Sequence, residues 1–577
     1  MPSIDQLRGR QLGRVLIKMG KLRRAQVHEA LDIQKERRGP IGAILVELGH
    51  ITEEDLNLAL AAQIGMEPIA LGKIDVPPEV LAVMTSLMAN TYRVVPYDLD
   101  TERNLLSLAL DNPDNFVATD DLKTLLDYDI KASLCTPAEL QAALDRFYPE
   151  GEQESISNLI DQLAEDEDLA KFQDRGDSID LAELREMMDL NPVKKLLNLV
   201  LLQAIKDKAS DIHFEPFEDE YKLRYRIDGV LYEMVPPPRY IALAISSRIK
   251  VMADLDIAER RLPQDGRIQL QLKGSPIDLR VSVLPTMFGE SVVLRVLDRS
   301  NVQLNLDKLG MREDDLEIFR QLIQKPNGII VNTGPTGSGK TTTLYAALSE
   351  LNTTKVKILT AEDPVEYDID GLVQTQIRTE VGLTFARALR SFLRQDPDII
   401  LVGEIRDLET GRISVQASLT GHLVLTTLHT NDAPSAVARL MDLGIESFLI
   451  TATMEAVVAQ RLVRRICTNC KEEYNPTEDL LMQVALRPED VGDQKFYYGK
   501  GCDYCNGTGY RGRVGLYEFM VFNDPIRELI MQNASTSILR REAIKHGMRT
   551  LRESGLLALY DGVTTIDEVV KETIFEQ

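Results

Sequence analysis

Residues 328–348 read GIIVNTGPTGSGKTTTLYAAL, and this stretch decides the fold. A predicted strand, Ile329–Asn332, leads into a glycine-rich turn that ends in Lys340 and Thr341, and a helical pattern follows. The spacing GxxxxGK[ST] between a strand and a helix is the phosphate-binding loop of α/β nucleotide-binding folds. Its glycines let backbone N–H groups converge on phosphate oxygens at a helix N-terminus. The stretch therefore predicts an α/β core that binds a nucleoside triphosphate.

The residues of this loop have distinct expected roles. Lys340 supplies a point charge for the β- and γ-phosphates, and Thr341 offers a hydroxyl to Mg²⁺. The predicted nucleotide-binding residues are Gly334, Pro335, Thr336, Gly337, Ser338, Gly339, Lys340, Thr341 and Thr342.

Two acidic clusters follow, each at the end of an apolar run. The stretch KVKILTAEDPVEY places Glu362, Asp363 and Glu366 after one predicted strand, and DPDIILVGEIRD places Glu404 after the next. An α/β fold puts its site at the carboxyl ends of its core strands. Carboxylates there favour hydrolysis of the nucleotide, because hydrolysis needs a metal-side carboxylate and a group that positions water. A nucleotide-gated module without turnover is the alternative class, and a pure binder needs no such groups.

A third motif, TGHLVLTTLHTNDA, carries two of the six histidines. His422 and His429 bracket one predicted strand. A lone histidine is usually a structural hydrogen-bonding residue, whereas two at one core strand favour a contact with the γ-phosphate.

These motifs, in this order and spacing, resemble those of the secretion ATPase superfamily, the motors of type IV pilus assembly, pilus retraction and type II secretion. The resemblance covers the chain from about residue 190 to 577. It implies an α/β, P-loop core of the RecA-like type that hydrolyses ATP with Mg²⁺. It also implies that Glu404 holds the Mg²⁺ shell through water and that Glu366 activates the attacking water, with Glu362 as its rival. The residues themselves do not order those two glutamates.

The stretch DLRVSVLPTMFGESVVLRVLD resembles a strand pair of the same family that carries two arginines, here Arg280 and Arg295. The resemblance implies a PAS-like α/β domain whose arginines reach the γ-phosphate when a ring of subunits closes. A guanidinium suits this role because it neutralises charge on the transferred phosphoryl group. Cross-strand ion pairing is the alternative.

Four of the five cysteines form two CxxC pairs separated by 31 residues: Cys467, Cys470, Cys502 and Cys505. Four thiolates make a closed tetrahedral Zn²⁺ site, which is structural because no coordination position stays open. A redox-active CxxC is the alternative. Within the resemblance, extension and secretion motors carry this insertion and retraction motors lack it. Cys135 stands alone and is expected in a core.

Composition limits the remaining classes. The 577 residues include 66 basic and 90 acidic ones, for a net charge of −24, which argues against generic nucleic-acid binding. No run of 18 apolar residues is present, and the first 15 residues lack the apolar core of an export signal. We therefore expect a cytoplasmic, multidomain protein.

The N-terminus contains an internal repeat with an offset of 29 residues. QLGRVLIKMGKLRRAQVHEALDIQ at 11–34 recurs as PIGAILVELGHITEEDLNLALAAQ at 40–63. Each block predicts a short helix, a glycine stop and a longer amphipathic helix. Thr52 and Asp55 have the spacing of a helix N-cap and its acidic partner.

In related motors, blocks of this form that begin Arg-Leu-Gly and end in Gln bind cyclic di-GMP. Here the arginine position holds Gln11 and Pro40, which cannot replace the bidentate contacts of a guanidinium. A repeat that docks partner proteins is therefore the alternative. If the ligand binds, Arg10 substitutes for the lost arginine, and the lining residues are Leu12, Gly13, Gln34, Ile41, Gly42 and Gln63.

We expect four parts in the chain. A regulatory domain at 1–149 precedes an acidic linker at 150–189, in which residues 151–189 hold 13 acidic and 3 basic side chains. An arginine-bearing domain at 190–305 and the ATPase domain at 306–577 follow, the latter with the cysteine insertion at 467–505.

The resemblance implies a homohexamer that acts from the cytoplasmic face on an inner-membrane platform protein. The expected function is type IV pilus assembly, and the alternative is the ATPase of a type II secretion system.

Overall fold

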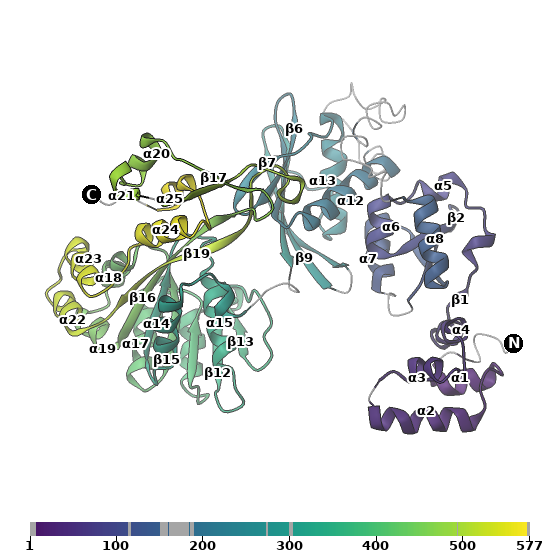
Figure 1. The fold of residues 1–577 in the computed structure, drawn as a ribbon, viewed down its shortest axis with the longest axis horizontal. Coiled ribbons are helices and arrows are strands. Elements are labelled where there is room, and N and C mark those ends of the chain that lie inside the picture. The colour runs from purple at the N-terminus through teal and green to yellow at the C-terminus, as the bar shows by residue number, and fades with distance from the viewer. Residues whose placement is uncertain are drawn as a thin grey trace. The chain divides into compact units, whose positions relative to one another are not determined.

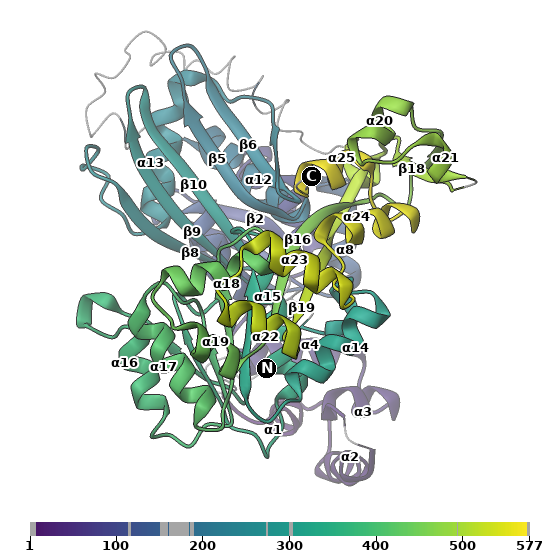
Figure 2. The ribbon, with the colours of Figure 1, turned by 90° about the vertical axis from the view of Figure 1, so that its left-hand side faces the viewer.

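The computed structural model describes residues 7, 9–37, 39–112, 117–149, 190–272, 275–298, 304–492 and 494–573, with Ile160, Leu184 and Met188. The predicted acidic linker at 150–189 lies outside these residues, apart from those last three. The chain forms two compact units, Met1–Asn301 and Val302–Gln577. Figures 1 and 2 show both units. The finer division into four parts stays a prediction.

The repeat forms two helical hairpins at the start of the first unit. Their helices are α1 (Leu12–Lys18), α2 (Arg24–Arg37), α3 (Ile41–Glu47) and α4 (Glu53–Ile64). Gly20 and Gly49 end the short helices with φ of +73° and +68°, which glycine adopts without strain. Thr52 and Asp55 form the expected reciprocal cap of α4. The predicted pattern of a short helix, a glycine stop and a longer helix is confirmed in both blocks.

Two other glycines of the repeat let its helices pack closely. A Cβ at Gly13 would lie 2.7 Å from Val27, and one at Gly42 would lie 2.6 Å from Leu56. Val27 and Leu56 are themselves one repeat apart. The two hairpins thus use the same contact, which gives these glycines a packing role.

A small α/β layer follows in the first unit. It contains β1 (Glu67–Pro68), η2 (Leu71–Lys73), α5 (Pro78–Leu81), α6 (Ser86–Tyr92), β2 (Val94–Asp100), β3 (Leu105–Leu110), α7 (Val117–Leu126), β4 (Asp129–Leu134) and α8 (Pro137–Phe147). Its four strands have the order β1-β4-β3-β2. Cys135 is buried there, as expected.

The first unit ends in a six-stranded antiparallel sheet of order β7-β6-β5-β10-β9-β8. The elements are α12 (Asn191–Lys206), β5 (Ala209–Pro216), β6 (Tyr221–Ile227), β7 (Val230–Glu233), η4 (Arg239–Ile241), α13 (Ala242–Met252), β8 (Gln264–Leu272), β9 (Ser275–Thr286) and β10 (Gly289–Asp298). α12 packs on β5 and α13 on β10. One buried apolar cluster runs from Ala61 to Leu294, so the small α/β layer and this sheet share a core.

The second unit is built on a seven-stranded sheet of order β13-β12-β14-β15-β11-β16-β19. Neighbouring strands are parallel from β13 to β16, and β19 is antiparallel to β16. Buried apolar side chains from the sheet and its helices form two large clusters. The predicted α/β fold with a P-loop core is confirmed.

The first half of this unit contains η5 (Leu306–Lys308), α14 (Glu313–Ile323), β11 (Gly328–Thr333), α15 (Lys340–Leu351), β12 (Ile358–Glu362), β13 (Val373–Gln376), η6 (Thr379–Val381), α16 (Phe385–Phe392), β14 (Ile399–Val402), α17 (Leu408–Leu419), β15 (Leu423–Leu428), α18 (Ala433–Asp442) and α19 (Ser447–Thr453).

The second half contains β16 (Met454–Ile466), β17 (Lys471–Tyr474), α20 (Glu478–Gln483), α21 (Pro488–Val491), β18 (Phe496–Gly499), η7 (Asp503–Cys505), β19 (Tyr510–Val521), α22 (Asp524–Met531), α23 (Thr536–Lys545), α24 (Leu551–Tyr560) and α25 (Ile566–Glu572). The cysteine insertion joins the long strands β16 and β19, and its own strands β17 and β18 form a separate two-stranded sheet.

Among the helices of the described ranges, none is both long and apolar enough to cross a bilayer.

Candidate active site and metal site

The phosphate loop joins β11 to α15 at the edge of the sheet where the parallel strands end. Gly334, Gly337 and Gly339 have φ of +151°, +83° and +88°, a region that other residues rarely adopt. A Cβ at Gly334 would also lie 2.5 Å from the carbonyl oxygen of Gln460. Because Gly339 caps α15 without a side-chain hydrogen bond, the backbone N–H groups of the first turn are offered to an anion. This loop fits a polyphosphate.

Lys340 lies inside the loop and is 8% exposed. Its Nζ donates to the carbonyl oxygens of Gly334 at 2.8 Å and Pro335 at 2.9 Å. Desolvation by burial, and then the nearby Arg461 cation, lower the pKa of Lys340 to about 8, although Glu404 opposes the change. A bound anion would favour the charged form of this side chain.

Gln460 supports the loop from the neighbouring strand β16, and sequence reasoning missed it. It is 2% exposed, and its Oε1 accepts from Asn332 at 3.1 Å and Thr343 at 3.0 Å. One amide therefore ties together the strand before the loop, the helix after it and β16. The available signal was a polar pair, Gln460 and Arg461, inside the stretch AVVAQRLV, whose other residues are apolar.

Glu404 and His429 meet at the ends of β14 and β15. Glu404 Oε2 is 3.4 Å from His429 Nε2, and Arg406 pairs with the same carboxylate. Thr427 Oγ1 donates to the carbonyl oxygen of Gly403 at 2.6 Å, which holds the two strand ends together. The structure brings this predicted pair together and adds Arg406, which the sequence analysis did not name.

His422 does not join this group within the chain. His422 precedes β15, whereas His429 follows it, so the two residues lie at opposite ends of this strand. His422 Nδ1 lies 2.7 Å from the carbonyl oxygen of Ala417 and 3.1 Å from Thr420 Oγ1, a local role at the end of α17. The length of the strand keeps the two histidines apart within this chain, and the contact of both with one γ-phosphate stays a prediction.

The two glutamates of the acidic cluster have different surroundings. Glu362 ends β12, is 4% exposed, and its carboxylate accepts hydrogen bonds from Tyr345, Thr360 and Gln374. Glu366 is half-buried on the loop that follows. The carboxylate of Glu362 is therefore committed to the protein interior.

Four arginines of the first unit lie in one row across its antiparallel sheet. Arg280 on β9 is directly opposite Arg295 on β10 and Arg267 on β8, and the row continues through Asp211 on β5 to Arg226 on β6. Asp211 pairs with Arg295 at 3.1 Å and with Arg226 at 3.6 Å. Arg295 thus makes a cross-strand ion pair, which was the alternative to a role at the γ-phosphate. Its side chain is nevertheless 62% exposed and faces solvent.

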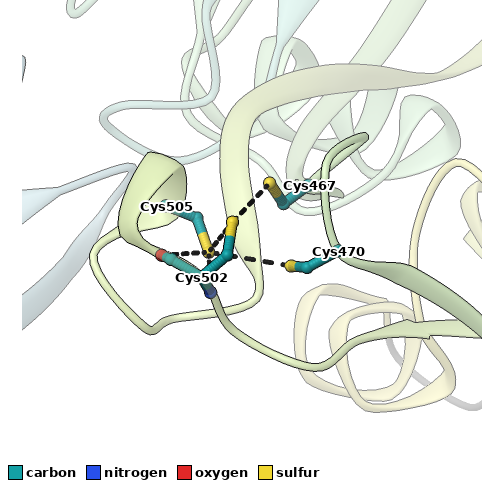
Figure 3. A group of neighbouring side chains, drawn as sticks. All are labelled: Cys467, Cys470, Cys502 and Cys505. Carbon is teal, nitrogen blue, oxygen red and sulfur yellow. Dashed lines mark hydrogen bonds between the residues drawn. The ribbon is translucent and has the colours of Figure 1, made fainter.

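The four cysteines of the insertion converge, as Figure 3 shows. Their Sγ atoms all lie within 4.8 Å of one another. Three pairs are 3.9, 3.8 and 3.7 Å apart: Cys467–Cys502, Cys470–Cys505 and Cys502–Cys505. Tetrahedral Zn²⁺ with Zn–S bonds of about 2.3 Å would space its sulfurs about 3.8 Å apart. The donor set fits a structural zinc ion.

Backbone N–H groups around the cysteines also suit thiolates. Gly501 donates to Cys470 Sγ, and Cys502 and Gly509 donate to Cys505 Sγ, each at 3.3 Å. Such outer contacts orient thiolate ligands and stabilise their charge. A Cβ at Gly509 would lie 2.3 Å from the carbonyl oxygen of Gly499, so this approach of two backbones requires glycine.

These features define the chain as a P-loop enzyme that hydrolyses ATP, with two strand-end carboxylates beside its phosphate loop and a four-cysteine insertion. The family model described as "Type II/IV secretion system protein" matches residues 186–571, and the MshEN domain model matches residues 64–154. The chain belongs to the type II/IV secretion system protein family.

Similar proteins come from both branches of this family. The chain is 46% identical to the type IV pilus assembly ATPase PilB of Myxococcus xanthus over 98% of this chain and 99% of that protein. It is 42% identical to the type II secretion system protein E of Xanthomonas campestris over 97% of each. Among solved structures, the Legionella pneumophila ATPase DotB matches with a TM-score of 0.48 and 20% identity, over 65% of this chain and 94% of that one.

Proposed function

We propose that this protein is the motor ATPase that powers type IV pilus assembly. The observation that carries the proposal is the alignment with a pilus assembly ATPase along both full chains at 46% identity. The cysteine insertion supports an extension motor, because the resemblance assigns such insertions to assembly and secretion motors. A type II secretion ATPase is the second candidate, favoured by the 42% identity to a secretion protein E.

Deleting the gene from its host separates these two functions. We expect surface pili to be lost and protein secretion to continue. Intact pili together with lost secretion would contradict the assignment to pilus assembly and favour the second candidate.

In the proposed reaction, Lys340 and the loop N–H groups bind the β- and γ-phosphates. A Mg²⁺ ion near Thr341 and, through water, Glu404 would neutralise charge on these phosphates. We assign activation of the attacking water to Glu366, because the carboxylate of Glu362 already accepts three hydrogen bonds. His429 Nε2 lies 3.4 Å from the Glu404 carboxylate, and we assign His429 a contact with the γ-phosphate.

Replacing Glu366 tests this assignment. Glu366→Gln removes the proton acceptor and should lower the rate of phosphate release by about 10²–10⁴-fold while ATP still binds. Asp368→Asn changes an exposed carboxylate on the same loop and should leave the rate unchanged. A near-normal rate in Glu366→Gln would assign the role elsewhere.

We further infer a homohexamer that docks on an inner-membrane platform protein from the cytoplasmic side. Arg280 and Arg295 would complete the nucleotide site of a neighbouring subunit, since guanidinium groups stabilise the transferred phosphoryl group. Two arginines of this row, Arg267 and Arg295, are exposed, and their exposure supports an anion-binding role for this face.

The N-terminal repeat is proposed as a regulatory module. Its two equivalent hairpins support the comparison with repeats that bind cyclic di-GMP. Gly13 packs against Val27, and Gly42 packs against Leu56. These contacts give the two glycines a packing role and do not leave them open to a ligand.

Calorimetry with cyclic di-GMP tests the repeat. Measurable heat that Arg10→Ala reduces would support a nucleotide-regulated module. No heat at high micromolar ligand would leave the repeat as a docking module for partner proteins.

A further inference from the structure

The helix that begins at the phosphate loop also contacts the loop that carries Glu366. Tyr345 lies in the second turn of α15 and is fully buried. Its hydroxyl donates to the carboxylate of Glu362 and accepts from the backbone N–H of Glu366 at 3.4 Å. One phenol therefore joins the phosphate-binding helix, the end of β12 and the backbone of the residue assigned to activate water.

The same helix holds the far end of that loop. Asn352, just past the C-terminus of α15, donates from Nδ2 to the carbonyl oxygen of Asp370 at 2.7 Å. A Cβ at Gly371 would lie 2.7 Å from Asn352 Oδ1, so the loop and the helix end are in close contact. Any displacement of α15 is thus transmitted to the loop at two points.

The loop is fixed from the other side by β13. Gln374 Nε2 donates to Glu362 at 3.2 Å and to the carbonyl oxygen of Tyr367 at 2.9 Å, and its Oε1 accepts from Ile369 at 2.9 Å. The ring of Tyr367 packs edge-on against Tyr345, with 5.8 Å between centroids. Glu362 therefore accepts hydrogen bonds from several parts of this network. These hydrogen bonds explain why its carboxylate is stable in a buried position.

The Tyr345 hydroxyl remains a donor throughout the range of pH in which the enzyme would work. Burial, and then the charge of Glu362, raise the pKa of Tyr345 well above its usual range. The phenol thus stays protonated and can donate to Glu362 while it accepts from Glu366.

We propose that Tyr345 is a positioning residue for ATP hydrolysis, whose hydroxyl holds Glu366 in register with the phosphate-binding end of α15. This inference rests on the proposed role of Glu366. In this arrangement Lys340 and Glu366 are linked through one helix, so that the water-activating carboxylate is placed relative to the bound phosphates. Glu362 acts through the same network and does not itself touch the attacking water.

Tyr345→Phe is the most direct test, because it keeps the ring and its contact with Tyr367 and removes only the hydroxyl. We expect kcat to fall by about tenfold or more, whereas KM for ATP stays within about threefold, since the change affects the transition state more than nucleotide binding. Tyr225→Phe is the matched control. Its buried hydroxyl donates to the carbonyl oxygen of Val200 at 2.8 Å in the other unit, and its loss should leave kcat unchanged.

Glu362→Gln provides a second, nearly isosteric variant. It should lower kcat to a similar extent, and the double variant should be no slower than the slower single one, because both act on one network. Additive losses would show that the two side chains act independently and would contradict the shared network.

The outcomes separate this inference from the proposed function. If the wild-type protein releases no phosphate from ATP, the proposed function itself is wrong. If the wild type is active and Tyr345→Phe has the same kcat, the positioning role is wrong and the ATPase assignment stands. If Tyr345→Phe loses nucleotide affinity and thermal stability together with kcat, Tyr345 is a structural residue only.

Discussion

Glu518 illustrates how a single buried carboxylate can hold two helices at once. It is 1% exposed on β19, and it accepts the backbone N–H groups of Ala433 at 2.7 Å and Leu551 at 3.2 Å. These are the first residues of α18 and α24, where the helix dipoles favour a negative charge.

Removing that charge should destabilise the second unit. Glu518→Gln keeps the shape and one acceptor, so we expect a loss of about 1–3 kcal/mol in unfolding free energy. Scanning calorimetry should show a lower transition temperature. Glu489→Gln is the control, because the Glu489 side chain is 75% exposed. Equal transition temperatures for the two variants would exclude this role.

Site residues could be named from the sequence where each of them lies in a recognisable local motif. The glycines and Lys340 of the phosphate loop must have one local geometry, so their spacing in the sequence was sufficient to predict the loop. Gln460 is 128 residues from its partner Asn332, and it reaches the loop because β16 is the neighbour of β11. No local sequence pattern encodes that two strands are neighbours in the sheet. For the same reason, the proximity of Arg461 to Lys340 could not be predicted.

At the scale of helices and strands, the repeat depends on close packing at its small residues. Gly42→Val would place a side chain 2.6 Å from Leu56 and should destabilise the two hairpins by about 1–3 kcal/mol through overpacking. Limited proteolysis should then cut within the first 63 residues faster, while ATP hydrolysis is unchanged. Gly39→Val is the control, because a Cβ at Gly39 meets nothing within 4 Å. Equal cleavage of both variants would refute this role.

The insertion between β16 and β19 depends on its metal. Cys470→Ser should abolish binding of one zinc ion per chain and lower the stability of the insertion, since structural zinc sites contribute directly to folding. Cys135→Ser should retain the metal, because Cys135 is buried in the other unit. Metal analysis of unchelated protein checks both variants. Wild-type protein without zinc would disprove the site.

Elements were predictable where their pattern was repeated or tightly spaced. The repeat with its 29-residue offset predicted both helical hairpins, and the paired CxxC motifs predicted the cysteine cluster. The two histidines, predicted to contact one γ-phosphate, lie apart within this chain for a geometric reason. Six residues of β15 lie between them, so seven steps of about 3.3 Å place their Cα atoms roughly 23 Å apart. Two residues that flank a strand therefore lie at its opposite ends and do not meet at one site.

At the scale of the whole molecule, the proposed ring shares each site between subunits. Lys340→Ala and Arg295→Ala should each be inactive alone, but a mixture should recover part of the activity. One type of interface in mixed rings then combines an intact phosphate loop with an intact arginine. Light scattering should show six subunits. No recovery on mixing would mean that both residues serve the same subunit, or that no ring forms.

The central claim is that the phosphate loop turns over ATP, and steady-state phosphate release with Mg²⁺ tests it most directly. We predict turnover by the wild-type protein and its loss in Lys340→Ala, which removes a point charge from a loop and leaves the fold intact. Circular dichroism of both proteins controls for folding. Turnover by a correctly folded Lys340→Ala protein at the wild-type rate would contradict the account.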